Sequence, residues 1–305
     1  TLDALRLTQK YKISVGELGK RYEAELSHMS LSAVRSKMKK RRDVLYGAVR
    51  LGLKSSAHSE SGLSGGDAYK LWIRIRQRKG MMGNKMTLRA MAYALAVVEQ
   101  NAAMGQIVAF PTAGGAGVVP GVLFSGAECF RASKRRLLSG MFAAAAVGIV
   151  IAEGATFSAA AAGCQAEIGA AAAMASAGLT EMRGGTPKQC FDSASIALKS
   201  YLGLVCDPLA GLVEAPCVKR NALATQAAIG ASDLVMAGIH SLIPFDEIVA
   251  TMKKIGKMMS PKLRETALGG LAVTPTGILA KKRLEERMNG NSCGACSQRC
   301  REKPV

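Results

Sequence analysis

Small apolar residues dominate the middle of this 305-residue chain and constrain its fold more than any other feature. Residues 86–280 are rich in Ala, Gly, Val, Leu, Ile and Met, whereas aromatic residues make up only 5% of the sequence. Ala, Leu and Met favour helices, while strands prefer aromatic and β-branched residues. No segment alternates apolar and polar residues with the period that a half-buried strand requires. The sequence therefore predicts an all-α fold, a single compact helical domain of Ala/Gly-rich helices with Gly/Pro-rich active-site loops.

The apolar content of 49% is enough to bury a core and excludes wholesale disorder. We expect a basic N-terminal helical segment (1–55), an apolar body (56–280) and a flexible, basic, Cys-containing tail (281–305). Residues 1–30 lack the apolar stretch of a secretory signal, so we expect a cytoplasmic protein. The best membrane candidate, Met141 to Ala162, is interrupted by Glu153 and predicts a buried helix instead.

Several helix boundaries can be predicted from turn and capping residues. Thr186, Pro187 and Gln189 form the pattern of a capping box, and Asp246 is the expected cap of a later helix. Two Pro and four Gly between Ala109 and Gly121 predict an irregular loop. The predicted helices cover 86–106, 165–183, 187–202, 219–239 and a segment from 246 onward.

Basic residues gather at the two ends of the chain, which has a net charge of +19. Residues 1–90 hold 20 Lys or Arg against 7 Asp or Glu, and the densest run is Lys37 to Arg42. Such runs bind nucleic acids or acidic partner subunits, but they are also common on solvated helix faces. Few aromatic residues accompany them, which argues against a single-stranded nucleic-acid site.

Three of the eight cysteines lie where predicted helices begin or end. Cys164 and Cys217 each precede a helix, and Cys206 follows one. Helix N-termini favour thiolates, and three thiolates without a nearby His or carboxylate at ligand spacing suit an iron–sulfur cluster better than catalytic zinc. Spacings of 42 and 11 residues match no compact cluster motif, so three buried structural cysteines are the alternative.

The sequence motifs around these cysteines resemble those of the α-chain of iron–sulfur-dependent L-serine dehydratases. The resemblance extends in order over roughly residues 60–280. The words are SGLSGGDAYK (61–70), NAAMGQIVAFPTAGGAGVVPG (101–121), GCQAEIG (163–169), MRGGTPKQ (182–189), GLVCDPLAGLVEAPCVKRNA (203–222) and RETALGGLAVTPTG (264–277).

The resemblance implies a mainly helical fold in which Cys164, Cys206 and Cys217 hold a 4Fe–4S cluster. One iron is then left open as a Lewis acid for the substrate hydroxyl. A base removes the α-proton of L-serine, and the products are pyruvate and ammonia. No pyridoxal phosphate takes part.

The Gly-rich loop gains a role from the same resemblance. Thr112, Gly114 and Gly115 let backbone N–H groups approach an anion such as the serine carboxylate, although a plain helix connection is the alternative. Ser64 lies in a second Gly-rich loop, whose Asp67 can also act as a simple helix cap. Two amides, Asn101 and Gln165, are further candidates for the substrate site, unless they satisfy backbone groups.

Two departures from the family pattern concern the active site: the first removes a polar Asn, and the second implies a partner. The family's Asn-Ala-Ser-Ile word is replaced here by Gly154–Phe157, and its Ser-His-Thr word, carried by the β part, is absent. None of His28, His58 and His240 stands in such a word. The resemblance therefore implies a separate β subunit that supplies the base, a hetero-oligomer with L-serine as substrate, and contact with neither membrane nor nucleic acid.

The tail carries three further thiols, Cys293, Cys296 and Cys300. One of them can serve as a fourth cluster ligand; a small zinc site and exposed thiols without a role are the alternatives. Two non-enzymatic hypotheses also stand beside the dehydratase subunit: a basic helical nucleic-acid-binding protein, and a non-catalytic subunit that stabilises a partner.

Overall fold

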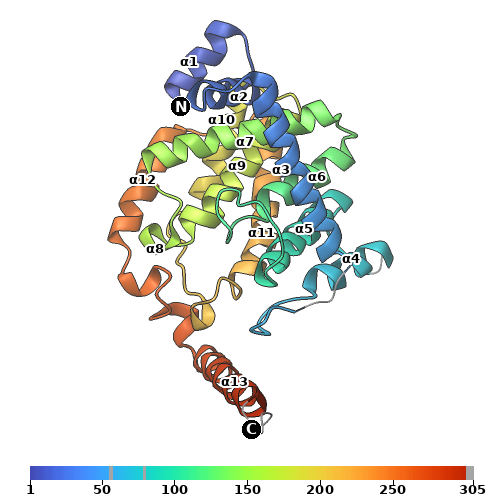
Figure 1. The fold of residues 1–305 in the computed structure, drawn as a ribbon. Coiled ribbons are helices and arrows are strands. Elements are labelled where there is room, and N and C mark those ends of the chain that lie inside the picture. The colour runs from blue at the N-terminus through green and yellow to red at the C-terminus, as the bar shows by residue number, and fades with distance from the viewer. Residues whose placement is uncertain (55–57, 78–79, 300–305) are drawn as a thin grey trace.

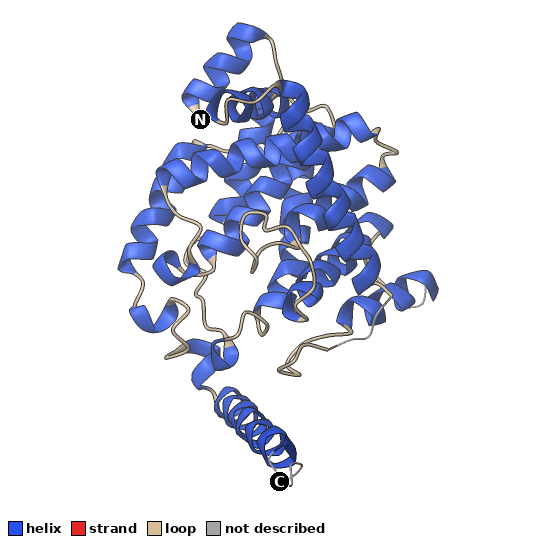
Figure 2. Cartoon of the chain, in the orientation of Figure 1, coloured by secondary structure: helices blue, strands red, loops and turns tan. Residues whose placement is uncertain are grey.

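The regular secondary structure of the described part of this chain is helical (Figure 2). The structure is a computed structural model that describes residues 1–54, 58–77 and 80–299, with side chains described as far as residue 287. Within those ranges there is no strand, which confirms the all-α prediction. The helices are α1 (Leu2–Tyr11), α2 (Val15–Leu26), α3 (Leu31–Gly52), α4 (Asp67–Gln77), α5 (Lys85–Ala102), α6 (Val118–Cys129), α7 (Lys134–Gly154), α8 (Ala159–Ala162), α9 (Ala170–Met182), α10 (Pro187–Lys199), α11 (Cys217–Met236), α12 (Phe245–Met258) and α13 (Pro275–Arg299), with short turns η1 (Gln165–Gly169), η2 (Leu209–Gly211), η3 (Pro261–Leu263) and η4 (Gly270–Val273).

Helix α9 forms the centre of the molecule, with α6, α7, α10 and α11 packed around it (Figure 1). Every one of its residues is buried. Its short side chains allow close approach: a Cβ on Gly178 would lie 2.6 Å from the carbonyl oxygen of Gly140 on α7. The Ala/Gly-rich composition thus allows the helices to pack closely around one core.

The close contact between α9 and α7 at Gly178 leads to a prediction about stability. We expect Gly178→Ala to lower the free energy of unfolding by about 2 kcal/mol, because the new methyl group would push two backbones apart. The matched control is Gly230→Ala on α11, where a Cβ meets nothing within 4 Å. The control should raise stability by up to about 1 kcal/mol through helix propensity. Denaturant titration measures both, and shifts of the same sign would contradict the packing argument.

The N-terminal segment is helical, as predicted, and belongs to the same core. Helix α2 packs on α7, and α3 packs on both α5 and α7. Val15, Val34, Met38 and Leu45 are buried in the core cluster. Helices α2 and α3 therefore pack against α5 and α7 as part of the same domain (Figure 1).

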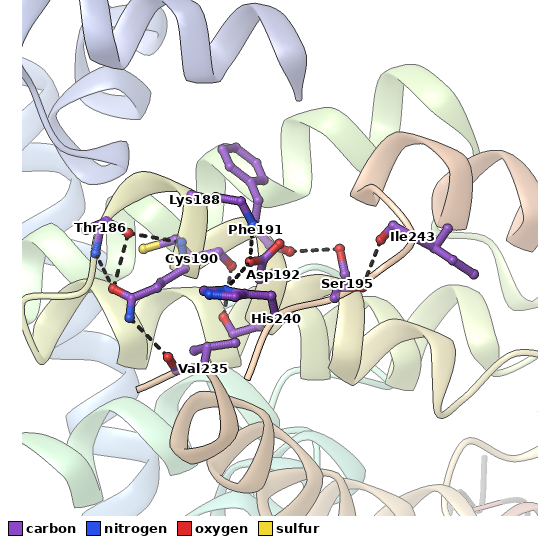
Figure 3. Close-up of polar contacts among 12 residues, drawn as sticks. Thr186, Lys188, Cys190, Phe191, Asp192, Ser195, Val235, His240 and Ile243 are labelled. Carbon is purple, nitrogen blue, oxygen red and sulfur yellow. Dashed lines mark hydrogen bonds and ion pairs between the residues drawn. The ribbon is translucent and has the colours of Figure 1, made fainter. Parts of the chain in front are cut away.

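Two predictions about individual helices are confirmed. Thr186 and Gln189 form the capping box, with Gln189 N donating to Thr186 Oγ1 at 3.3 Å and Thr186 N donating to Gln189 Oε1 at 2.9 Å (Figure 3). Helix α7 covers most of the apolar Met141 to Ala162 stretch. It is long and apolar enough to cross a membrane, but most of its apolar stretch is buried inside the protein, as in a core helix.

Other boundaries differ from the prediction. Asp246 is not a cap: Pro244 occupies that position, and Asp246 lies inside the first turn of α12, where a carboxylate still favours the helix dipole. Pro120 belongs to the first turn of α6, because an N–H there needs no partner within the helix. The segment predicted as one helix from Gln165 begins with the wider turn η1 before α9. The tail is helical through Arg299 as α13, whose start contacts η2 and η4.

Candidate functional site

Three buried cysteines from different parts of the chain come together. Cys164 directly precedes η1, Cys206 lies in the loop after α10, and Cys217 is the first residue of α11. Cys164 shifts the pKa of Cys206 and of Cys217, and each of them shifts the pKa of Cys164, which makes the three near neighbours in the fold. The structure thus brings together the three cysteines that the sequence singled out, and leaves the buried Cys190 on α10 outside the group.

The charges around the cysteines favour one thiolate. Hydrogen bonds from Cys206 and Cys217, followed by the nearby Arg220 guanidinium, hold the pKa of Cys164 far below its usual range. The same hydrogen bonds, together with burial, raise the pKa values of Cys206 and Cys217 above theirs. Negative charge in this group therefore concentrates on Cys164.

Arg220 connects this group to two loops. It donates to the Cys164 sulfur at 3.4 Å, to the Val205 carbonyl at 2.9 Å and to Asp207 Oδ1 at 2.9 Å. The other oxygen of the buried Asp207 accepts the backbone N–H of Leu271 at 2.9 Å. Arg220 therefore brings positive charge to the thiols and fixes the segments that carry them.

Backbone hydrogen bonds hold Cys206 against the 264–277 word. Cys206 N donates to the Leu263 carbonyl at 2.9 Å, and Glu265 N donates to the Cys206 carbonyl at 2.8 Å. Glu265 keeps this position with a φ of 60°, an uncommon value for a residue with a side chain. The start of the 264–277 motif thus holds the loop that carries Cys206.

The predicted Gly-rich loop lies beside Cys217 because Asn221 ties it there. This fully buried amide donates to the Gly114 carbonyl at 2.6 Å and to the Cys217 carbonyl at 3.0 Å. Its oxygen accepts the Gly117 N–H at 3.1 Å. Within the loop, the Thr112 hydroxyl accepts the Gly115 N–H at 3.2 Å. Three predicted residues, Thr112, Gly114 and Gly115, therefore stand next to the cysteine group.

Glu167 on η1 also faces this loop, and the sequence analysis did not single it out. A Cβ on Gly114 would lie 2.8 Å from Glu167 Oε2, so the missing side chain allows the carboxylate to lie against the loop. Burial raises the pKa of Glu167 to about 7, and negative charge on Cys164 and Glu265 adds to the rise, against the lowering effect of the Thr112 hydroxyl. The only sequence feature that could have indicated it is a single acidic residue in the mostly apolar segment that follows Cys164.

The second Gly-rich loop is fastened to the cysteine loop by a buried carboxylate. Glu214 accepts the hydroxyls of Ser59 (2.5 Å), Ser61 (2.8 Å) and Ser64 (2.5 Å). The Ser64 hydroxyl is therefore engaged within the protein. Asp67 does not cap α4: Glu99 accepts its N–H at 2.8 Å, and the Asp67 carboxylate pairs with Lys219 at 2.6 Å.

The structure does not connect the two candidate amides to this group. Gln165 bonds the Met252 carbonyl and the Gly203 N–H, which matches the alternative of a buried amide that satisfies backbone groups. Asn101 is half-buried in the last turn of α5, and among the described residues its side chain forms no hydrogen bond to the Gly-rich loop or the cysteines.

His240 lies in a different cluster, shown in Figure 3. Its Nδ1 is 3.1 Å from Asp192 Oδ2, an oxygen that also pairs with Lys188 at 2.7 Å. The tail thiols cannot be placed in either cluster. Cys293 and Cys296 lie on α13, where side chains are not described, and Cys300 lies outside the described residues. Cluster ligation by the tail stays a prediction.

Comparison with known proteins gives consistent matches over most of the chain. The family described as "Serine dehydratase alpha chain" matches residues 10–272. A probable L-serine dehydratase alpha chain of Bacillus subtilis (strain 168) is 44% identical over 293 residues, covering 96% of each chain. The L-serine dehydratase alpha chain of Peptoniphilus asaccharolyticus is 40% identical over 265 residues, covering 87% of this chain and 90% of the relative. An L-serine dehydratase of Escherichia coli (strain K12) is 44% identical over 183 residues, which span only 40% of its own length.

Proposed function

Because this chain belongs to the serine dehydratase alpha chain family, we propose that it is the α subunit of an L-serine dehydratase, converting L-serine to pyruvate and ammonia. We propose further that Cys164, Cys206 and Cys217 hold a 4Fe–4S cluster and that no pyridoxal phosphate is used. The observation that carries the proposal is the convergence of three buried thiols from separate segments beside a Gly-rich loop.

The chemistry of the donor set supports a cluster. The described residues contain no group of three or more His, Cys, Asp or Glu arranged around a single metal ion. In a polynuclear cluster each thiolate binds a different iron, so the thiols need only face one shared space. Soft thiolate ligands select iron–sulfur clusters over hard cations, and the adjacent Arg220 offsets the negative charge of the assembly. When bound, a cluster with an open iron supplies Lewis acidity to a substrate hydroxyl.

The residues of this chain would bind and orient the substrate. The N–H groups of Ala113 and Gly114 donate to no acceptor within the described residues, and Gly114 has no side chain of its own to block a ligand. These donors suit a carboxylate, as backbone N–H groups in anion-binding loops do. Asn221 holds the loop beside Cys217, so a bound carboxylate would place the rest of the amino acid next to the thiols.

We propose that the proton-abstracting base comes from a separate β subunit. The Escherichia coli relative carries the matching region as 40% of one longer chain, which supports the idea that a further part is needed. The names of the first two relatives, which describe alpha chains, support the same arrangement. We accordingly propose a hetero-oligomer that acts in the cytoplasm in amino-acid degradation. These relatives give no support to the nucleic-acid-binding alternative.

The test is to purify the chain together with its β partner without oxygen and to record the visible spectrum and pyruvate formation from L-serine. We expect a brown protein with thiolate–iron absorbance whose activity fades in air as the bands bleach. A colourless, iron-free complex that still forms pyruvate would overturn the cluster assignment. A coloured complex with no activity on L-serine would overturn the substrate.

A further inference from the structure

Glu167 is a buried carboxylate with no cation beside it. Only 9% of its surface is exposed, and no Lys, Arg or His forms an ion pair with it within the described residues. The two basic residues nearest in the sequence to Cys217 are engaged elsewhere: Arg220 pairs with Asp207, and Lys219 pairs with Asp67. Burying a carboxylate without a counter-charge is costly, and a bound positive group would offset that cost.

Glu167 faces the Gly-rich loop of the proposed substrate site. Its Oε2 lies 2.8 Å from the position that a Cβ on Gly114 would take, and the Gly114 N–H donates to no acceptor within the described residues. Its own backbone N–H donates to the Cys164 carbonyl at 3.2 Å, so η1 carries the thiol and the carboxylate on one short segment. A ligand held by the loop therefore meets the Glu167 carboxylate on one side and the thiols on another.

An amino acid has the charges that this arrangement requires. Its carboxylate suits the N–H groups of the Gly-rich loop, and its α-ammonium group suits an acidic side chain that is shielded from water. The side-chain hydroxyl of serine is then left to face the cysteine group. We propose that Glu167 binds the α-ammonium group of the substrate and makes the site specific for amino acids over hydroxy acids. This inference rests on the proposed dehydratase function.

The experiment compares L-serine with 3-hydroxypropanoate, which is serine without its ammonium group. Both are assayed on the anaerobic αβ enzyme, L-serine through its KM and 3-hydroxypropanoate through its inhibition constant. We expect Glu167→Gln to raise the KM for L-serine roughly 10- to 100-fold, as for a lost hydrogen bond to a charged group. The inhibition constant of 3-hydroxypropanoate should stay unchanged.

The matched control is Glu181→Gln on α9. Glu181 is as buried as Glu167 but accepts the Ser139 hydroxyl at 2.6 Å, away from the loop. It should alter neither constant. Iron content and visible absorbance are recorded for every variant. If Glu167→Gln loses the cluster, Glu167→Asp, which keeps the charge on a shorter side chain, replaces it and should raise only the KM for L-serine.

The role of Glu167 would be overturned if Glu167→Gln raised the KM for L-serine and the inhibition constant of 3-hydroxypropanoate equally. An unchanged KM for L-serine would overturn it as well. A wild-type complex that forms no pyruvate would instead overturn the proposed function, so the two failures are distinguishable.

Discussion

Replacing Cys164 by Ser is expected to leave the purified αβ enzyme colourless and to lower its rate of pyruvate formation at least about 10³-fold. Cys164 is the thiol on which the other two converge and the one that Arg220 contacts at 3.4 Å. A hydroxyl ionises far less readily than a thiol and is a poor ligand for iron, so the site would lose its most anionic donor. The loss of Lewis acidity accounts for the size of the effect. Visible absorbance, iron content and activity are measured on the same sample.

Cys190→Ser is the matched control for this variant. Cys190 is also fully buried, but it lies on α10 beside Glu181, outside the cysteine group. We expect this variant to keep its colour and its activity. Full colour and activity in Cys164→Ser, or an equal loss in Cys190→Ser, would contradict the ligand assignment. A melting temperature for each variant separates loss of the cluster from loss of the fold.

Asn221→Leu should produce the largest stability change of any single substitution considered. The change preserves the shape of the side chain but leaves the Gly114 carbonyl and the Gly117 N–H without their buried partner. Two buried unsatisfied backbone groups cost about 4 kcal/mol of unfolding free energy. Because the Gly-rich loop would also move, we expect kcat/KM for L-serine to fall about 100-fold. Denaturant titration of the variant and wild type side by side, with steady-state kinetics, measures both effects.

The control for Asn221 is Asn101→Leu. Asn101 is also a helical Asn, but it is half-buried and has no side-chain hydrogen bond among the described residues. We expect its stability to change by less than about 0.5 kcal/mol, as for an ordinary surface position. A large loss of activity with unchanged stability at Asn101 would restore it as a substrate residue. A small effect at Asn221 would show that other contacts hold the loop.

The helices and one helix cap of this protein could be predicted from its sequence, because both depend on local interactions. The composition predicted helices because Ala and Leu favour them wherever they stand, and Thr186 and Gln189 predicted a capping box because that motif closes within four residues. Where a prediction failed, the residue suits more than one place: Asp suits both a cap and the first turn of a helix, and Pro suits both a loop and a first turn. The sequence could not choose between those positions.

The candidate site divides in the same way. Cys164, Cys206 and Cys217 could be named from the words around them, since thiols are rare and their chemistry is distinctive. Glu167, Asn221 and Glu214 could not, because a lone acid or amide in a helix or loop has many ordinary roles. Their importance depends on segments about 50 to 150 residues away in the chain, such as Gly114 for Glu167 and the serines of the 59–64 loop for Glu214.

By itself, the order of residues therefore determined the helices and their small-residue faces and singled out three of the eight cysteines, because each of these follows from side-chain type and near neighbours. Only the tertiary structure decided that the sulfurs share one space, that a glycine loop lies beside them and that an uncompensated carboxylate faces that loop. Those outcomes depend on how α9 and α11 pack, and packing is fixed by the fit of the whole core.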